Sequence, residues 1–531
     1  MNKRLFVLLL IFAIIMTSVF ASGNNESKKE PAPAVAATDN GNGTLPILAK
    51  PTKFTIFSNF DNIVFDSDWQ VFKEVGDKTN IYLESVISKS NSNEKEAFNL
   101  MVASGKLADI VSYVNSNDLE NLGRNGGLAP LNDLIDKYAP NIKRTLKENS
   151  AFATAAYSQD GNIYYIPKGM GLKFSEFYWL RMDWLEKLGL EVPNTTDELY
   201  EVLVAFRTLD PNGNGKEDEI PLFDRRGDRS SDEYLHLFNT STEFSLKNGI
   251  VVYDPLENEF STGVKELAKW YREGLIDPEF FTRGAKSRDI LLSANQGGFT
   301  HDWVSTGNYN AQLQKDIPGF SIQAIAPPAS PYGTRILRDE RSANTGWSIS
   351  SQCKDPVAII KYFDYFFSEE GDDYINWGIE GETYAYDENG EKYFLDHIMN
   401  GETTPILALR KYGVQYRIGM IQDGDYEIAC MSDEAKTAAE LYSSHPEWYP
   451  TETLRYQNQR LVIKILAEDD ARYKKVLASV RPYIDEMYQS WVLGTRDFDQ
   501  DKAEFLKELD KRGIQEAIDI VQRAYSFTNK K

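Results

Sequence analysis

The chain has 531 residues and a formal net charge of −22 at pH 7, and its aromatic side chains include 9 Trp, 29 Tyr and 28 Phe. This length suffices for two or three packed units, and the negative charge excludes nucleic acid and anionic membranes as partners. The two cysteines, Cys353 and Cys430, are too few for a disulfide scaffold or a thiolate metal site, and the sequence leaves open whether they pair.

The N-terminal region predicts an export signal followed by a tether. Two basic residues precede a mostly apolar run over residues 5–20, and Ala21 is a small residue suited to signal cleavage. The run is too short to predict a membrane span. Residues 22–51 hold almost no large apolar side chain, which predicts a disordered tether. We therefore expect a signal peptide over 1–21 and a mature protein that is a soluble monomer, periplasmic or extracellular.

After the tether, the pattern predicts an α/β fold. The segment "TKFTIFSNF" (52–60) has the alternation of a first buried strand. Helical stretches then alternate with short apolar strands such as "ADIVSYV" (108–114) and "FSIQAIAP" (320–327). Alternation of this kind is typical of sheets flanked by helices.

Two helices have clear signals at their ends. Thr195 and Glu198 form a capping box, followed by a stripe of apolar residues at Leu199, Val202, Leu203, Phe206 and Leu209. Asp355 is expected to cap a second helix, with Pro356 in its first turn and Gly371 at its end. The aromatic residues in such stripes are predicted to lie in the core, as are Trp179, Trp184 and Trp270.

The segment "DPNGNGKEDEIPL" (210–222) predicts a calcium loop. Its acidic and amide side chains alternate around glycines that permit tight bends, and calcium prefers a shell of many oxygen ligands. The expected ligands are Asp210, Asn212, Asn214, the carbonyl of Lys216, Asp218 and Glu219. An EF-hand would need a glutamate where Pro221 stands, so we expect a weak structural site, with a dissociation constant on the order of 10⁻⁴ to 10⁻³ M. The alternative is a hydrated turn without metal.

The chain resembles the extracellular solute-binding proteins of ABC importers, in the oligosaccharide-binding branch that includes alginate-binding and LipO-type proteins. The resemblance covers nearly the whole mature chain, and its blocks occur in family order. The blocks are "YWLRMDWLEKLGLEVPNTTDELYEVLVAFRTLDPNGNGKEDEIPL" (178–222), "NLMVASGKLADIV" (99–111), "WYREGLIDPEFFTRG" (270–284), "GWSISSQCKDPVAIIKYFDYFFSEEG" (346–371), "NWGIEGETY" (376–384) and "WVLGTRDFDQDKAEFLKELDKRGIQEAIDIVQRAYS" (491–526).

This resemblance implies a two-lobed periplasmic-binding-protein fold of type II, with a hinged cleft between the lobes. It places the first lobe at 52–165 plus 340–378 and the second at 166–339 plus 379–531. It also implies capture of an oligosaccharide, delivery to ABC permease subunits, and calcium in the loop described above. Many relatives carry a lipidated cysteine after the signal peptide, whereas this chain has Ser22 there, so we expect no lipid anchor.

A sugar site needs aromatic planes for stacking and polar side chains for hydrogen bonds to hydroxyls. Trp303 is the strongest candidate, because it lies among polar residues outside any helical stripe and matches a ligand-facing region of relatives. Further candidates, each with packing, a hinge or a plain turn as the alternative, are Trp347, Trp377, Glu380, Tyr384, Tyr164, Tyr165 and Asn59. Arg225, Arg226 and Arg229 could make the potential of the cleft locally positive.

Two other functions are weighed against import. An exported, acidic, aromatic-rich chain could be a glycosidase or lyase, but no carboxylate pair stands out, Glu380 with Glu382 included, and the four histidines have no metal-ligand spacing. His301 could contact a ligand, although a structural histidine is commoner. A sensor subunit that presents sugar to a receptor is the third possibility. We expect a binding protein, not an enzyme.

Overall fold

The computed structural model describes residues 44–528, with gaps at 61–62, 89–92, 114, 170–175, 226–230, 334–343, 402, 417, 446–447 and 449–464. The expected signal peptide, almost all of the tether, and Arg226 and Arg229 lie outside the described residues. Thr38–Lys531 forms one compact unit. In the part of the chain that is described, no helix has both the length and the apolar character needed to cross a membrane.

The first lobe is built on a five-stranded sheet. Its strands, in spatial order, are β4 (Ile81–Ser85), β1 (Thr52–Phe57), β5 (Ile110–Ser112), β13 (Asn344–Ile349) and β6 (Ile166–Lys168). β1 pairs in parallel with β4 and β5, while β13 is antiparallel to both β5 and β6. The predicted first strand is thus confirmed, and it is followed by the short pair β2 (Asn59–Phe60) and β3 (Ile63–Val64).

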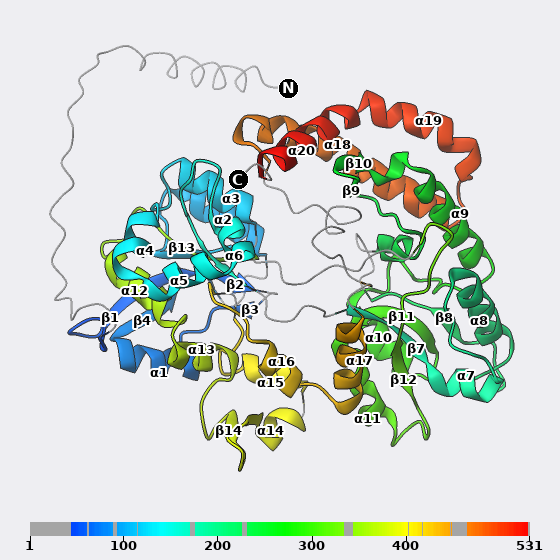
Figure 1. Cartoon of the computed structure of the whole chain (residues 1–531), viewed down its shortest axis with the longest axis horizontal. Helices are drawn as coiled ribbons and strands as arrows, with labels where there is room; N and C mark the ends of the chain where they lie inside the picture. The colour runs from blue at the N-terminus through cyan, green and yellow to red at the C-terminus, as the bar shows by residue number, and fades with distance from the viewer. Residues whose placement is uncertain are drawn as a thin grey trace, which may run out of the picture. The chain divides into compact units, whose positions relative to one another are not determined.

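Both faces of this sheet are covered. Ile56 and Ile110 belong to one hydrophobic core, whereas their neighbours Phe57 and Val111 belong to another, because successive strand residues point to opposite faces. Helices α2 and α3 pack on the second core, while α1, α4, α5 and α12 pack on the first (Figure 1). These helices span Glu94–Ser104 (α2), Ser116–Arg124 (α3), Gln70–Thr79 (α1), Asn132–Tyr138 (α4), Pro140–Glu148 (α5) and Pro356–Tyr365 (α12), and α6 covers Ser150–Ala156.

The core of the first lobe extends further along the chain than the predicted boundary at 378. Ile379, Leu409 and Tyr426 are buried in the same core as Ile56, so residues 379–430 belong to the first lobe and not to the second. Ile47 and Leu48, at the end of the expected tether, are also buried in this core. The added elements are α13 (Glu369–Asn376), the hairpin β14 (Tyr384–Tyr386) and β15 (Lys392–Phe394), α14 (Asp396–Met399), α15 (Pro405–Arg410) and α16 (Gly424–Ala429).

The second lobe has a four-stranded sheet and a separate core. The spatial order is β12 (Ile322–Ile325), β7 (Glu176–Arg181), β11 (Gly297–Trp303) and β8 (Ile220–Leu222). β7 is antiparallel to β12 and β11, and β8 is parallel to β11. Trp179, Trp184 and Trp270 are buried in this core, as predicted.

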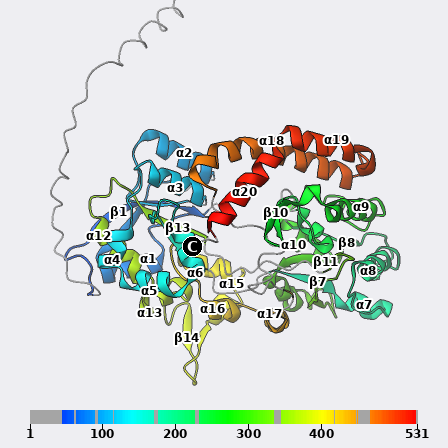
Figure 2. The ribbon, with the colours of Figure 1, turned by 45° about the horizontal axis from the view of Figure 1, so that its top comes forward.

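The helices of the second lobe come from two stretches of chain. The first stretch gives α7 (Met182–Leu188), α8 (Thr196–Thr208), α9 (Asn258–Arg272), α10 (Ser287–Ser293) and α11 (Tyr309–Leu313), with short 3₁₀ helices that include η4 (Val304–Asn308), and the hairpin β9 (Phe244–Lys247) and β10 (Ile250–Tyr253). The second gives α17 (Asp433–Ser444), α18 (Ala467–Val492), α19 (Phe498–Lys511) and α20 (Ile514–Thr528). α18 packs against α9 and α20 (Figure 2).

The helix-end signals were read correctly at two of three ends. The capping box of Thr195 and Glu198 is present at α8, and Asp355 caps α12 by accepting from the backbone N–H of Ala358. Gly371, however, does not end that helix. α12 ends at Tyr365, and Gly371 lies inside α13, where a Cβ atom would come within 2.0 Å of the Tyr365 carbonyl oxygen. The close approach of α13 to the end of α12 therefore requires a glycine at this position, and the glycine does not mark a helix end.

Candidate functional site

The second lobe presents a half-buried tryptophan at the edge of its sheet. β8 and β11 are parallel, so their carboxyl ends lie at the same edge. Trp303 ends β11 and is half-buried, whereas the other six residues of that strand are buried. Arg225 follows β8 at the same edge. Open α/β sheets present ligands at the carboxyl ends of their strands, so Trp303 lies where a ligand residue is expected.

Two arginines flank the carboxylate of Asp302, the residue before Trp303. Arg225 Nε lies 3.3 Å from one carboxylate oxygen, and Arg288 Nη1 lies 3.4 Å from the other. The side chain of Asp302 is 1% exposed, that of Arg288 11% and that of Arg225 27%. The guanidinium groups therefore lie between the buried carboxylate and the surface.

Hydroxyl and ring groups of η4 and α11 complete this region. Arg288 Nη1 donates a hydrogen bond to Thr306 Oγ1 at 3.0 Å, and its guanidinium carbon lies 5.3 Å from the centre of the Tyr309 ring. The backbone N–H of Trp303 donates to Asp302 Oδ1 at 2.7 Å, which fixes the strand end against the carboxylate. We call Trp303, Asp302, Arg225 and Arg288 the edge cluster.

Sequence reasoning named Trp303 and Arg225 as candidates but did not name Arg288. Arg288 belongs to α10, 63 positions after Arg225, and joins Arg225 only because α10 packs beside β11. No local pattern in the sequence indicates this contact. His301 is buried and its ring lies 4.4 Å from that of Tyr178, which supports a structural role.

The candidates in the first lobe are mostly buried. Tyr164 and Tyr165 are 5% and 2% exposed, and their hydroxyls donate to Asp160 Oδ2 at 2.7 Å and to the Ala155 carbonyl at 2.6 Å. Both hydroxyls thus bond within the protein. Asn59 follows β1 and is 1% exposed.

The two other candidate tryptophans take the packing role that the sequence left open. Trp347 is fully buried in β13 and stacks on Phe363, with ring centres 4.1 Å apart and planes 13° apart. Trp377 is 3% exposed, and its Nε1 donates to Asp423 Oδ2 at 3.1 Å. Neither tryptophan therefore belongs to the edge cluster.

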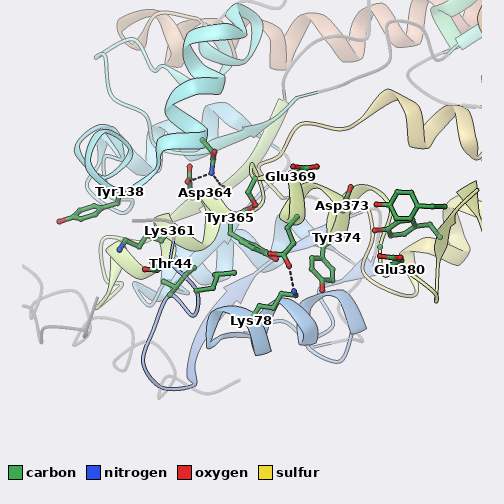
Figure 3. A pocket seen from close by; sticks show the side chains of 18 residues that line it. Thr44, Lys78, Tyr138, Lys361, Asp364, Tyr365, Glu369, Asp373, Tyr374 and Glu380 are labelled. Atoms are coloured by element: carbon green, nitrogen blue, oxygen red, sulfur yellow. Dashed lines mark hydrogen bonds and ion pairs between the residues drawn. The ribbon is translucent and has the colours of Figure 1, made fainter. Parts of the chain in front are cut away.

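Glu380 and Tyr384 line a groove of about 700 Å³ in the first lobe (Figure 3). Five tyrosines and five carboxylates face this groove together with Lys78 and Lys361. Lys78 Nζ lies 2.5 Å from a carboxylate oxygen of Glu370, and the carboxylates that line the groove outnumber the lysines, so the lining is predominantly negative. Burial raises the pKa of Asp364, at the floor of the groove, to about 6.

The expected calcium loop joins α8 to β8, and hydrogen bonds hold its side chains. Asp210 accepts from the backbone N–H groups of Asn214 and Gly215 at 3.1 and 3.0 Å. Asn212 and Asn214 each donate to Asp218 at 3.0 Å. Although burial opposes it, these amide hydrogen bonds hold the pKa of Asp218 below its ordinary value.

Glu219 is the residue of this loop whose surroundings favour a cation. The residue is 1% exposed, and neither carboxylate oxygen has a hydrogen-bond partner in the described structure. Burial raises the pKa of Glu219; the nearby backbone N–H groups of Glu219 and Asn212 oppose this rise, and the charges of Asp210 and Asp218 add to it. A buried carboxylate without a partner is costly, and a divalent cation would remove that cost. Within the described ranges, however, no three His, Cys, Asp or Glu side chains are gathered as metal ligands.

The two cysteines are buried free thiols. Burial raises the pKa of Cys353 to about 12 and also raises that of Cys430, so neither thiol is activated. Of the two possibilities that the sequence left open, the structure has the unpaired one.

Comparison with known proteins gives one consistent result. The family model of the bacterial extracellular solute-binding proteins matches residues 72–373. A fructooligosaccharide ABC transporter substrate-binding protein, FusA of Streptococcus pneumoniae serotype 4, is 26% identical over 514 residues, covering 91% of each chain. The polygalacturonan/rhamnogalacturonan-binding protein YtcQ of Bacillus subtilis is 26% identical and covers 59% of this chain and 63% of its own. The crystal structure of the alginate-binding protein AlgQ2 without calcium ion is 36% identical, with a TM-score of 0.79 over 92% of this chain and 100% of that one.

Proposed function

Because this chain belongs to the bacterial extracellular solute-binding protein family, we propose that it is the substrate-binding subunit of an ABC transporter and that its substrate is an oligosaccharide. The observation that carries the proposal is the full-length likeness to FusA and AlgQ2, which are both named for binding glycans. The chain is exported, acts outside the cytoplasm as a monomer, and delivers the sugar to permease subunits without altering it.

The edge cluster supplies the chemistry that such a substrate needs. The half-buried ring of Trp303 offers a plane for the C–H face of a pyranose, and the guanidinium groups of Arg225 and Arg288 offer N–H donors to its oxygens. Sugar held by the second lobe would supply contacts to the first, so the ligand favours the closed arrangement by its differential affinity for it. Permease subunits then recognise that arrangement.

Calcium is proposed as a structural cofactor of the loop after α8. Asp210, Asn212, Asn214, Asp218, Glu219 and the carbonyl of Lys216 would hold it. The cation supplies positive charge beside the buried Glu219 carboxylate and so stabilises the turn that enters β8. The loop precedes the amino end of β8, whereas the edge cluster lies at the carboxyl ends of β8 and β11, so the cation takes no part in sugar contact.

Two alternative functions remain: a carbohydrate-active enzyme, and a sensor subunit that presents sugar to a receptor. The relatives that match are named as binding proteins, which favours capture over chemistry. Sensing uses the same binding step and differs only in the protein that recognises the closed form.

A ligand panel with a product assay tests the proposal. Purified protein is titrated calorimetrically with tetrasaccharides of different composition, and each mixture is then separated by size to measure chain length. We expect at least one sugar to bind with its length unchanged. Shortened sugar would identify an enzyme, and a complete absence of binding across neutral and acidic sugars would contradict the proposed substrate class.

A further inference from the structure

The groove of the first lobe lies at the amino ends of two strands. Thr44, Leu45 and Ile47, which line it, precede β1, and Lys78, which also lines it, precedes β4. Open α/β sheets present their main ligand at the opposite edge, where the carboxyl ends of the strands lie. An occupant of this groove would therefore be distinct from the transported sugar.

Tyrosine rings and carboxylates suit this groove to ammonium groups. Three lysines of the chain already place Nζ over its rings, 5.7 Å from the centre of Tyr374, 5.6 Å from that of Tyr138 and 5.8 Å from that of Tyr384. An aromatic face attracts a cation through its quadrupole. The lysines are, in that order, Lys78, Lys361 and Lys392; the tyrosines of the lining are Tyr138, Tyr365, Tyr374, Tyr384 and Tyr386, and its carboxylates are Asp364, Glu369, Glu370, Asp373 and Glu380.

Three of the five carboxylates have partners within the protein. Glu370 pairs with Lys78, and Asp373 pairs with Lys392. Asp364 accepts two hydrogen bonds from the first turn of α5. In both ion pairs the ammonium group contacts a carboxylate and lies over a tyrosine ring. The groove therefore already holds ammonium groups by this combination of contacts.

The two other carboxylates of the groove have no such partner. Glu369 and Glu380 are exposed, and neither side chain makes an ion pair or a hydrogen bond with any described residue. The groove therefore keeps an excess of negative charge, and the net charge of the chain adds to its attraction for cations. Other charged groups near the lining are Glu74, Asp372 and Asp423 on the negative side and Arg144 on the positive side.

The wall of the groove also contains a polar atom that lacks a partner. Tyr365 is 7% exposed, and its buried hydroxyl makes no hydrogen bond within the described residues, although it lies close to Glu370. A buried hydroxyl without a partner costs free energy, which a ligand N–H group donating to its oxygen would recover. Tyr365 is among the side chains that line the groove in Figure 3. Its hydroxyl therefore favours an occupant with hydrogen-bond donors.

The two unpartnered carboxylates are spread along α13. Glu369 is the first residue of this helix, and Glu380 follows its last residue by four positions. Figure 3 shows Asp373 between them. A helix of eight residues is about 12 Å long, so a single small cation is too short to contact both carboxylates. An occupant that contacts both must be elongated and must carry a cation near each end.

We propose that this groove binds a linear polyamine, whose terminal ammonium groups contact Glu369 and Glu380 and whose methylene chain lies along the tyrosine rings. The Tyr365 hydroxyl accepts a hydrogen bond from one of the ammonium groups. The site goes beyond the proposed function, because it needs neither the edge cluster nor a sugar.

Calorimetric titration with spermidine tests the site. Spermidine carries three amino groups on an extended chain, whereas 1,3-diaminopropane is a short dication and 1,8-octanediol is a neutral chain. All titrations contain millimolar calcium, so that the loop after α8 is not open to other cations. We expect spermidine to bind with a Kd below about 1 mM at low salt, at least about tenfold more tightly than either control. No binding of spermidine, or equal binding of 1,3-diaminopropane, overturns the proposal.

Variants assign the binding to residues. Glu380→Gln is the main variant, because Glu369 also lies in the first turn of α13, where a negative charge stabilises the helix. Glu380→Gln should weaken spermidine binding by about tenfold. Glu382→Gln removes the same charge two positions away, from an exposed side chain outside the groove, and should bind as the wild type does. Tyr365→Phe removes only the hydroxyl and should weaken binding by about threefold without lowering the melting temperature.

The other outcomes identify a different occupant or a different place. Spermidine binding that Glu380→Gln and Glu382→Gln weaken equally would reflect the overall charge of the chain and overturn the site. Tighter binding of trilysine than of spermidine, lost in Glu380→Gln, would overturn the polyamine and indicate a basic protein segment. Competition between spermidine and a bound sugar would overturn the assignment to this groove. A chain that binds spermidine here but no sugar would contradict only the proposed function.

Discussion

The carboxylate of Asp364 accepts a hydrogen bond at 2.8 Å from the backbone N–H of Ile142, a residue 222 positions earlier in the chain. Ile142 lies in the first turn of α5, where backbone N–H groups have no partner within the helix. Asn141 Nδ2 donates to the same carboxylate at 3.0 Å. A side chain of α12 therefore caps α5 and joins the two chain segments of the first lobe.

Asp364→Ala should lower the free energy of unfolding by about 1–3 kcal/mol, because the variant leaves the buried N–H of Ile142 without an acceptor. Urea-induced unfolding followed by tryptophan fluorescence measures this difference. Asp136→Ala is the control, because Asp136 is 67% exposed and pairs with Lys143 on the outside of α5. It should cost less than about 1 kcal/mol. Equal effects of the two variants would show that Asp364 does not act as a cap.

Asp372 should make stability depend on pH. Burial, and then the negative charges of Asp423 and Asp373, raise the pKa of Asp372 from 3.8 to about 7. The folded protein therefore holds this proton more tightly than the unfolded chain does. Its contribution to stability is complete below about pH 4 and is lost as the pH rises through 7.

Asp372→Asn should remove this pH dependence. The free energy of unfolding, measured in urea at half-unit steps from pH 4 to 7, should fall less steeply with pH than in the wild type, by up to about 1.4 kcal/mol per unit. Glu388→Gln, at the exposed turn of the β14–β15 hairpin, removes one negative charge and should leave the slope unchanged. A wild-type slope in Asp372→Asn would contradict the raised pKa.

Calcium should stabilise the protein without changing sugar binding. Addition of EGTA is expected to lower the melting temperature by a few degrees, and millimolar calcium should restore it, because the cation binds only the folded loop. Asp218→Asn should abolish this response. Asp387→Asn, in a second Asp/Asn/Gly turn of the β14–β15 hairpin, should keep it. A melting temperature that is insensitive to both additions would favour the turn without metal.

Trp303 and Trp347 should respond in opposite ways to substitution. Trp303→Ala removes a half-buried ring at the sheet edge and should weaken sugar binding at least about tenfold, with a small change in stability. Trp347→Ala removes a ring packed on Phe363 and should cost about 3–5 kcal/mol of stability. Calorimetric titration and urea unfolding of both variants test this pair. If a folded Trp347→Ala protein loses sugar affinity and Trp303→Ala keeps it, the sugar site lies in the first lobe and not at Trp303.

The sequence correctly predicted features that depend on the spacing of residues within one helix or strand. The capping box at Thr195, the cap at Asp355 and the burial of Trp179, Trp184 and Trp270 all follow from signals within one helix or strand. These features need no knowledge of distant contacts, which is why reasoning from spacing was sufficient.

Features that depend on distant segments could not be predicted in the same way. The packing of residues 379–430 with the first lobe depends on contacts with strands more than 250 positions earlier. The pairing of Arg288 with Asp302 depends on how α10 packs. In each case the deciding partner lies outside the local pattern.

The place of β13 between β5 and β6 sets the order in which the sheet of the first lobe can be completed as the chain is synthesised. A chain that emerges from its N-terminus delivers β5 and β6 early, but the strand that joins them arrives only after residues 169–343 have passed. Until then both strands present unpaired backbone groups. Completion of this sheet therefore competes with the capture of its open edges by chaperones, proteases or other chains.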